Sequence, residues 1–263
     1  MGNHFLSHHL AKPQARHCQM NFLQHHPFAV KAHFDQSLVL AYAVPAEELR
    51  PHVPAPLQLD LFQDSHAFIA LAMVETSLLR PSLFPKFLGR SFTLLGYRAF
   101  VRYTGADGRT RRGLYILRSE TDSPFMTFSG NIFTQYCYKT VKLNWQKFQD
   151  GSEKITTNLG LEIETAPTSE EPLLPPESIF PDWRQARRFA GPMPFTFSHD
   201  PETQKMISVE GVRQKWTPGP IEIHSHKVPY FDQFNFTSCI LANAFTVQDI
   251  PYLWKKGTTE HCP

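Results

Sequence analysis

The sequence is short of the features that mark secreted and membrane-spanning proteins. It has four cysteines in 263 residues, and they show no Cys-x-x-Cys spacing, so we expect no disulfide framework and a reducing compartment. The N-terminus carries His, Gln and Lys instead of a basic start and a long apolar core, so we expect no secretory signal. The longest apolar runs, 38–46 and 67–74, fall far below the ~20 residues that cross a bilayer. These absences predict a soluble, cytoplasmic protein.

Charge and short motifs exclude further classes. A formal net charge of +2 gives no general attraction to nucleic acid or to anionic membranes. The chain has neither a Gly-rich phosphate loop nor a Gly-x-Ser-x-Gly elbow. It is instead rich in Phe and Pro, with 22 of each, which predicts many aromatic side chains to bury and many interrupted connections. The length fits one large β domain about as well as two smaller ones.

Strand patterns dominate after residue 28, while residues 1–28 show no sustained period and are expected to form a flexible arm. Short runs of β-branched, aromatic and leucine residues predict strands at 67–75, 94–103, 113–120, 124–129, 154–165, 205–216 and 221–227.

Turns and two helical signals complete this pattern. A hairpin is predicted at 103–109, and short helices at 45–50 and at 182–189, the second capped by Asp182. Together these patterns predict a mainly β protein with a few short helices, folded as a closed or nearly closed antiparallel barrel over residues 29–263.

The run Pro-Phe-Met-Thr-Phe-Ser-Gly-Asn-Ile-Phe-Thr-Gln-Tyr-Cys-Tyr-Lys at 124–139 carries a family resemblance. It resembles the stretch of acetoacetate decarboxylases in which proline and a few apolar residues precede glycine-arginine-glutamate, with two adjacent lysines further on. Counted from Gly130, the first lysine falls on Tyr138 and the second on Lys139. Residues 35–60 are similar to the family's opening strand, short helix and Val-Pro-x-Pro-Leu corner.

Three further motifs resemble a branch of the acetoacetate decarboxylase-like superfamily known as a domain of unknown function. These are Tyr136-Cys137-Tyr138, the run Phe-Thr-Leu-Leu-Gly-Tyr-Arg at 92–98, and Pro-Tyr-Leu-Trp at 251–254. The order and spacing of the motifs implies an acetoacetate decarboxylase-like antiparallel β-barrel with an apolar internal pocket.

The resemblance does not extend to the family's reactive groups. In the family the first lysine forms a Schiff base with the ketone, and that position is Tyr138 here. The family's two carboxylates fall on Ile69 and Leu94, and its arginine falls on Asp35. Four changes together imply that Schiff-base decarboxylation is not retained.

Tyr138 and Lys139 are nevertheless the candidate catalytic residues. A lysine attacks a ketone only when it is neutral, which requires its pKa to fall by several units through burial or a neighbouring cation. If the segment is extended, the two side chains point to opposite faces, so Lys139 does not simply replace its neighbour. A surface lysine is the alternative interpretation.

The substrate-binding candidates lie on one strand. Leu94, Gly96, Arg98 and Phe100 alternate and therefore share a face. A guanidinium on an apolar face either pairs with a buried carboxylate or binds a ligand anion. Glu75 and Asp35 are the candidate protein partners, and the hydroxyl of Tyr138 is a candidate second donor. We assign Arg98, Phe100 and Leu94 to substrate binding.

A histidine pair provides a weaker metal hypothesis. In a strand, His224 and His226 would lie on one face together with Glu222, a spacing that suits zinc or iron. Because the chain has 13 histidines, such a pair arises easily by chance. We therefore expect no metal site and no cofactor.

These residues predict an enzyme that acts on a small organic acid or ketone in an apolar barrel pocket, with lyase-like or isomerase-like chemistry and no Schiff base. The alternative is a non-catalytic small-molecule binding or regulatory protein on the same barrel; a structural oligomer with a filled core is a third reading. The expected partner is a small apolar organic anion or a ketone. Nucleic acid and membranes are not expected as partners, and a homo-oligomer is left open.

Overall fold

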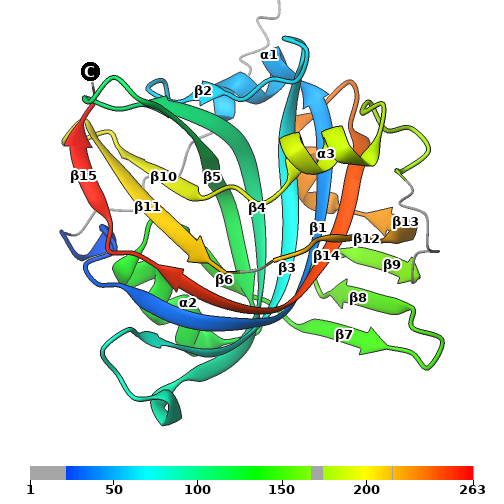
Figure 1. Cartoon of the computed structure of the whole chain (residues 1–263), viewed down its shortest axis with the longest axis horizontal. Coiled ribbons are helices and arrows are strands. Elements are labelled where there is room, and N and C mark those ends of the chain that lie inside the picture. Colours follow the sequence, from blue (N-terminus) through cyan, green and yellow to red (C-terminus); the bar gives the residue numbers. More distant parts are fainter. Residues whose placement is uncertain (1–21, 167–173, 215, 263) are drawn as a thin grey trace, which may run out of the picture.

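The computed structural model describes residues 22–166, 174–214 and 216–262, and strands dominate it (Figure 1). The large sheet consists of β1 (Val30–Pro45), β2 (Gln58–Leu59), β3 (His66–Pro81), β4 (Arg90–Thr104), β5 (Thr110–Thr121), β6 (Tyr138–Thr140), β10 (Phe195–Asp200), β11 (Lys205–Arg213), β12 (Gly219–Pro220), β14 (Ile240–Trp254) and β15 (Thr258–His261). The smaller sheet consists of β7 (Leu143–Lys147), β8 (Glu153–Thr157), β9 (Glu162–Ala166) and β13 (Glu222–Lys227).

The large sheet closes on itself. Its strands follow the order β14-β1-β3-β4-β5-β10-β11, and β11 pairs back to β14. The pairings are antiparallel except that β5 pairs in parallel with β10 and β6. The α-helices are short: α1 (Ala46–Leu49), α2 (Pro124–Phe133) and α3 (Trp183–Ala190). The predicted mainly β class is confirmed, and the ring of strands is compatible with the expected barrel.

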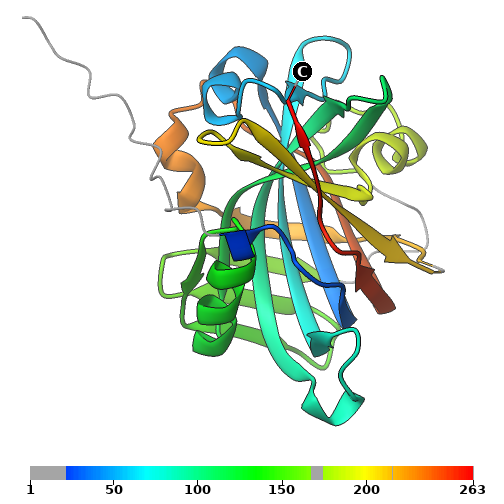
Figure 2. The same ribbon diagram turned by 90° about the vertical axis from the view of Figure 1, so that its left-hand side faces the viewer.

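The central strands bury both of their faces, which explains their long apolar runs. In β3 every residue from Ala67 to Val74 is buried. One face of the sheet packs Leu38, Leu40 and Tyr42 into the main core, while the other face packs beneath α3 or borders an internal cavity. Figure 2, turned by 90°, shows α2 and the β3–β4 hairpin at the lower end of the ring.

Residues 124–129, predicted to be a strand, form the first part of α2, so that prediction is wrong. The side chain of Ser123 accepts a hydrogen bond from the N–H of Met126 at 3.2 Å, and Pro124 occupies the first helical position. A Ser cap followed by Pro is a helix-start signal. It outweighs the β preference of the two phenylalanines in this run.

One other strand prediction needs correction, and one long strand was missed. The run 154–165 is two strands, β8 and β9, because Gly160 adopts φ +86° in the turn between them. The strand β14 was not predicted at all, since Gln248, Asp249 and Pro251 interrupt its apolar pattern. The hairpin at 103–109 is confirmed, with Gly108 at φ +71°.

The helix near residue 182 is also confirmed, and Asp182 caps it by accepting the N–H of Gln185 at 2.7 Å. The expected N-terminal arm lies outside the described residues as far as residue 21. Within residues 22–28, Gln24 and His26 are buried, and the backbone N–H of His26 donates to the carbonyl of Phe133 at 3.0 Å. None of the helices in the described part of the chain is long and apolar enough to cross a bilayer.

Candidate ligand-binding cavity

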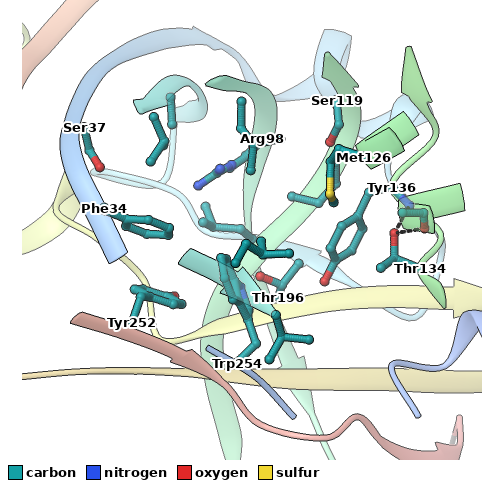
Figure 3. A pocket seen from close by; sticks show the side chains of 18 of the residues that line it. Phe34, Ser37, Arg98, Ser119, Met126, Thr134, Tyr136, Thr196, Tyr252 and Trp254 are labelled. Carbon is teal, nitrogen blue, oxygen red and sulfur yellow. Dashed lines mark hydrogen bonds between the residues drawn. The ribbon is translucent and has the colours of Figure 1, made fainter. Parts of the chain in front are cut away.

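The ring of strands encloses a cavity of about 500 Å³, shown in Figure 3. Its walls come from β1, β3, β4, β5 and β14, and α2 with the segment 190–193 adds further side chains. Aliphatic and aromatic residues make up most of the lining. Small-molecule sites are typically concave, mostly apolar and about 300–1,000 Å³ in volume, so the cavity has the size and character of a ligand site.

The charged side chains at this cavity are of one sign. Arginine appears four times in the lining, as Arg80, Arg90, Arg98 and Arg213, and no Asp, Glu or Lys of the described chain lines it. Arg213 is held by the protein, because its guanidinium donates to the carbonyls of Pro192 and Met193 at 2.7 and 3.4 Å. The cavity therefore favours anions over cations.

Arg98 is the charged group that projects into the middle of the cavity from β4 (Figure 3). Its Nε is inaccessible to solvent and has no hydrogen-bond partner among the described residues. Burial lowers the pKa of Arg98, and the nearby phenols of Tyr252, Tyr138 and Tyr136 oppose that shift in decreasing order. A buried, unpaired Nε on a cationic group costs free energy, so an anionic ligand that pairs with Arg98 would offset that cost.

The ion-pair interpretation of Arg98 is wrong, because both candidate carboxylates are engaged elsewhere. Glu75 binds Lys147 at 2.5 Å, and Asp35 accepts the hydroxyl of Ser77 at 2.9 Å. The other predicted substrate-binding residues, Leu94 and Phe100, line the cavity together with Arg98.

The absence of a side chain at Gly96 determines where the guanidinium of Arg98 can lie. A Cβ at position 96 would lie 2.7 Å from Nε and 3.0 Å from Nη2 of Arg98. Strand alternation puts residues 96 and 98 on one face, so the long side chain folds back across the glycine. The missing Cβ is what leaves room for this conformation.

Tyr138 also lines the cavity, and α2 holds both its backbone and its ring. Its backbone N–H donates to Asn131 Oδ1 at 2.7 Å, and its carbonyl accepts from Asn131 Nδ2 at 3.0 Å. Its ring packs against Gly130 of α2, where a Cβ would lie 2.5 Å from the ring. Burial raises the pKa of Tyr138 to about 12, although Arg98 acts to lower it, so the phenol is a neutral donor at physiological pH.

Lys139, the other catalytic candidate, is not part of this cavity. It is exposed on β6 and pairs in register with Glu120 of β5. Tyr138, the residue before Lys139, pairs in register with Ser119 of β5, and both of these residues line the cavity. The predicted opposite orientation of residues 138 and 139 is thus observed, and the structure does not bring the two catalytic candidates together.

Several polar cavity residues were not singled out from the sequence. They are Ser37 of β1, Ser119 of β5, Tyr136, Thr196 of β10 and Tyr252 of β14. Figure 3 shows the hydroxyls of Tyr136 and Thr196 on one side of the cavity and Tyr252 stacked near Phe34 on the other; the Phe34 and Tyr252 ring centroids are 4.5 Å apart. Tyr136 and Tyr252 both lie in the motifs quoted above, which was the available signal.

The histidine pair does not form the arrangement that the metal hypothesis required. A β-bulge at His224 shifts the register of β13, and the two rings make different contacts. His224 lies 3.6 Å from Glu222, whereas His226 Nδ1 is 3.2 Å from the hydroxyl of Tyr42. Within the described ranges no group of three or more His, Cys, Asp or Glu residues could hold a metal ion.

Comparison with known proteins places the chain in a family. Residues 31–176, more than half of the chain, match the model of a domain-of-unknown-function family described as "Uncharacterized conserved protein", and the chain belongs to this family. No curated protein matches its sequence.

Solved structures share the fold at low identity. An acetoacetate decarboxylase from Legionella pneumophila has a TM-score of 0.59 and 11% identity, over 92% of this chain and 91% of its own. An acetoacetate decarboxylase-like enzyme from Sphingomonas wittichii has a TM-score of 0.56 and 11% identity, over 90% and 94%. The enduracididine biosynthesis enzyme MppR, complexed with the condensation product of pyruvate and imidazole 4-carboxaldehyde, has a TM-score of 0.57 and 9% identity, over 89% of both chains. The fold is therefore acetoacetate decarboxylase-like, and these proteins that share it are enzymes.

Proposed function

We propose that this protein binds a small organic anion with an apolar body in the cavity, and that Arg98 is the anion-binding residue. One observation carries the proposal: the guanidinium of Arg98, whose Nε is buried and which has no carboxylate partner in the described chain, projects into a mostly apolar cavity of about 500 Å³. Because no described Asp or Glu lines the cavity, an anionic ligand meets attraction without like-charge repulsion there.

The surrounding residues have separate roles in this proposal. The guanidinium of Arg98 binds the carboxylate or another anionic group, and the hydroxyl of Tyr138 donates a further hydrogen bond. Leu94 and Phe100 contact the apolar body of the ligand. A charge-assisted hydrogen bond in such a setting contributes ~1.5–3 kcal/mol, so Arg98 supplies a large part of the affinity.

Catalysis is the second candidate function, with lyase-like or isomerase-like chemistry and no Schiff base. Two observations favour it. Enzymes share the fold, and one of them is complexed with the condensation product of pyruvate, an organic acid, and imidazole 4-carboxaldehyde. The phenols of Tyr136 and Tyr138 lie around Arg98, and burial raises the pKa of both. Neutral phenols and a guanidinium are suited to stabilise an enolate oxygen as charge develops on it.

Binding is tested first by identifying what the protein carries. Mass spectrometry of an organic extract of the purified protein should reveal an anion with an apolar body. Isothermal titration calorimetry with aliphatic and aromatic carboxylates of increasing size should then find a ligand whose affinity falls roughly 10- to 100-fold in Arg98→Met, since ~1.4 kcal/mol is tenfold. Arg109→Met, at an exposed position in the β4–β5 turn, is the matched control. Equal affinity in Arg98→Met would refute the proposal.

A separate measurement distinguishes catalysis from binding. NMR in D₂O follows the protons next to the carbonyl of the 2-oxo acids that bind. Catalysis through an enolate predicts exchange of these protons with solvent, reduced in Tyr138→Phe. Binding without exchange assigns the cavity to a non-catalytic protein.

A further inference from the structure

The cavity opens between the β3–β4 hairpin and α2. Of the described residues that line it, the exposed ones are Phe84, Leu88 and Arg90 of the hairpin region and Phe125 of α2. The guanidinium of Arg90 lies 5.3 Å from the ring centre of Phe125, which joins the two elements. Figures 1 and 2 both show the hairpin projecting from the body at the lower end of the ring. We call the hairpin from Leu78 to Arg90 together with α2 the entrance surface.

The entrance surface exposes large apolar side chains that do not line the cavity. Leu83 is 94% exposed, Phe87 is 83% exposed, and Phe128 of α2 is 69% exposed. Phe84 and Leu88 beside them are about half exposed, at 52% and 48%. Contiguous exposed apolar groups of this size mark contacts with a protein or a membrane.

The charges around these apolar groups are basic. Arg80, Lys86 and Arg90 lie in the hairpin, and no acidic residue occurs between Glu75 and Asp107. The helix α2 has no charged residue. Along the sequence, the acid nearest to α2 is Asp122, just before the helix, and its carboxylate accepts the backbone N–H of Thr93 at 2.9 Å.

This charge pattern disfavours a second copy of the chain as the occupant. A two-fold interface brings the same surface of both copies together, so Lys86 and Arg90 would approach the same cations of the partner with no acid in the hairpin or in α2 to neutralise them. An anionic lipid surface fits better, because apolar side chains insert at the level of the headgroups while Lys and Arg contact the phosphates.

We propose that the entrance surface docks on an anionic lipid bilayer and places the mouth of the cavity against it, so that an amphiphilic anion enters from the lipid. The second part of this proposal rests on the function proposed for the cavity. The whole-chain charge of +2 argued against membranes as partners. Screening limits electrostatic attraction to within ~8–10 Å of the surface, however, so a local basic cluster decides the contact.

Vesicle co-sedimentation tests the docking. The probes are vesicles of phosphatidylcholine with phosphatidylglycerol, and of phosphatidylcholine alone. The protein should bind the anionic vesicles more tightly, and high salt should weaken that binding. Leu83→Ser/Phe87→Ser should reduce partitioning about 100-fold or more, since burial of each of the two side chains contributes at least about a tenfold factor. Phe148→Ser/Leu159→Ser, at half-exposed positions next to strands of the smaller sheet, is the matched control and should bind like the wild type.

Three outcomes would overturn the proposal. These are no binding of the wild type to anionic vesicles, unchanged binding of Leu83→Ser/Phe87→Ser, and a dimer in sedimentation velocity that this variant dissociates. The third outcome would assign the entrance surface to self-association. Carboxylate titrations in lipid-free buffer keep the two proposals apart, because Leu83 and Phe87 do not line the cavity. Leu83→Ser/Phe87→Ser should retain soluble-ligand affinity, and Arg98→Met should retain vesicle binding.

Discussion

Replacing Arg98 by methionine should make the ligand-free protein more stable while it weakens ligand binding. The guanidinium Nε is buried and has no hydrogen bond from the described chain, and no described carboxylate pairs with Arg98. Burial lowers the pKa of Arg98, so the folded state holds this proton less tightly than the unfolded state does. The charged form of Arg98 therefore opposes folding at neutral pH.

The expected gain follows from the cost of the buried polar group. Burying a polar group without a hydrogen bond costs ~1–3 kcal/mol in protein mutational data. Methionine keeps an unbranched apolar stem and removes the charged head, so Arg98→Met should raise the free energy of unfolding by about 1–3 kcal/mol. For a domain of roughly this size, each kcal/mol corresponds to about 2–4 °C in Tm.

Urea unfolding of the ligand-free protein followed by circular dichroism measures this effect. Arg98→Lys keeps the buried charge and should bring no gain, and Arg109→Met alters an exposed side chain and should change nothing. If Arg98→Met lowers the free energy of unfolding by about 1 kcal/mol, the size of a typical lost hydrogen bond, then Arg98 serves the fold and the reasoning is refuted.

Three further predictions concern Gly96, His26 and the lysines. Gly96→Ala puts a methyl group where Nε of Arg98 would be only 2.7 Å away, so calorimetry should show carboxylate affinity falling about tenfold; unchanged affinity would show that the guanidinium conformation is unimportant. Burial lowers the pKa of His26 from 6.5 to about 4, so the folded state favours neutral His26, and stability is lost as pH falls from 6.5 towards 4. Urea unfolding should show the wild type losing about 2 kcal/mol more than His26→Phe between pH 7 and pH 5, and equal losses would contradict this. Because Lys139 is exposed and no described lysine lines the cavity, borohydride reduction with acetoacetate should leave no adduct by mass spectrometry; an adduct on any lysine would restore Schiff-base chemistry.

The position of Arg98 could be predicted because it depends on local geometry. Alternation along one strand puts Leu94, Arg98 and Phe100 on one face, and the family resemblance indicated which face is internal. The structure keeps that arrangement. The same alternation predicted that the side chains of Tyr138 and Lys139 point to opposite faces of their strand. These predictions needed no knowledge of which strands pair.

The rest of the cavity depends on contacts between distant parts of the chain. Ser37 and Tyr252 reach it because β1 pairs with β14, a pairing that no local pattern reveals. The helix α2 was misread because Phe125 and Phe128 favour strands in isolation, while the cap at Ser123 was overlooked. The two phenylalanines are exposed on the helix, so the apolar pattern of this run does not mark the buried face of a helix.

The pairing of β1 with β14 also sets the order in which this protein can be assembled. Their register runs from Val30 opposite Trp254 to Ala43 opposite Ile240. The strand β1, which is synthesised early, therefore cannot pair with β14 until nearly the whole chain has been synthesised. Such distant pairing slows folding, because a long loop must close before its contacts form. Until then the edge of β1 is open to wrong partners. The cavity is therefore complete only when synthesis has passed β14, and a nascent chain stalled before that point should fold its hairpins without forming the cavity.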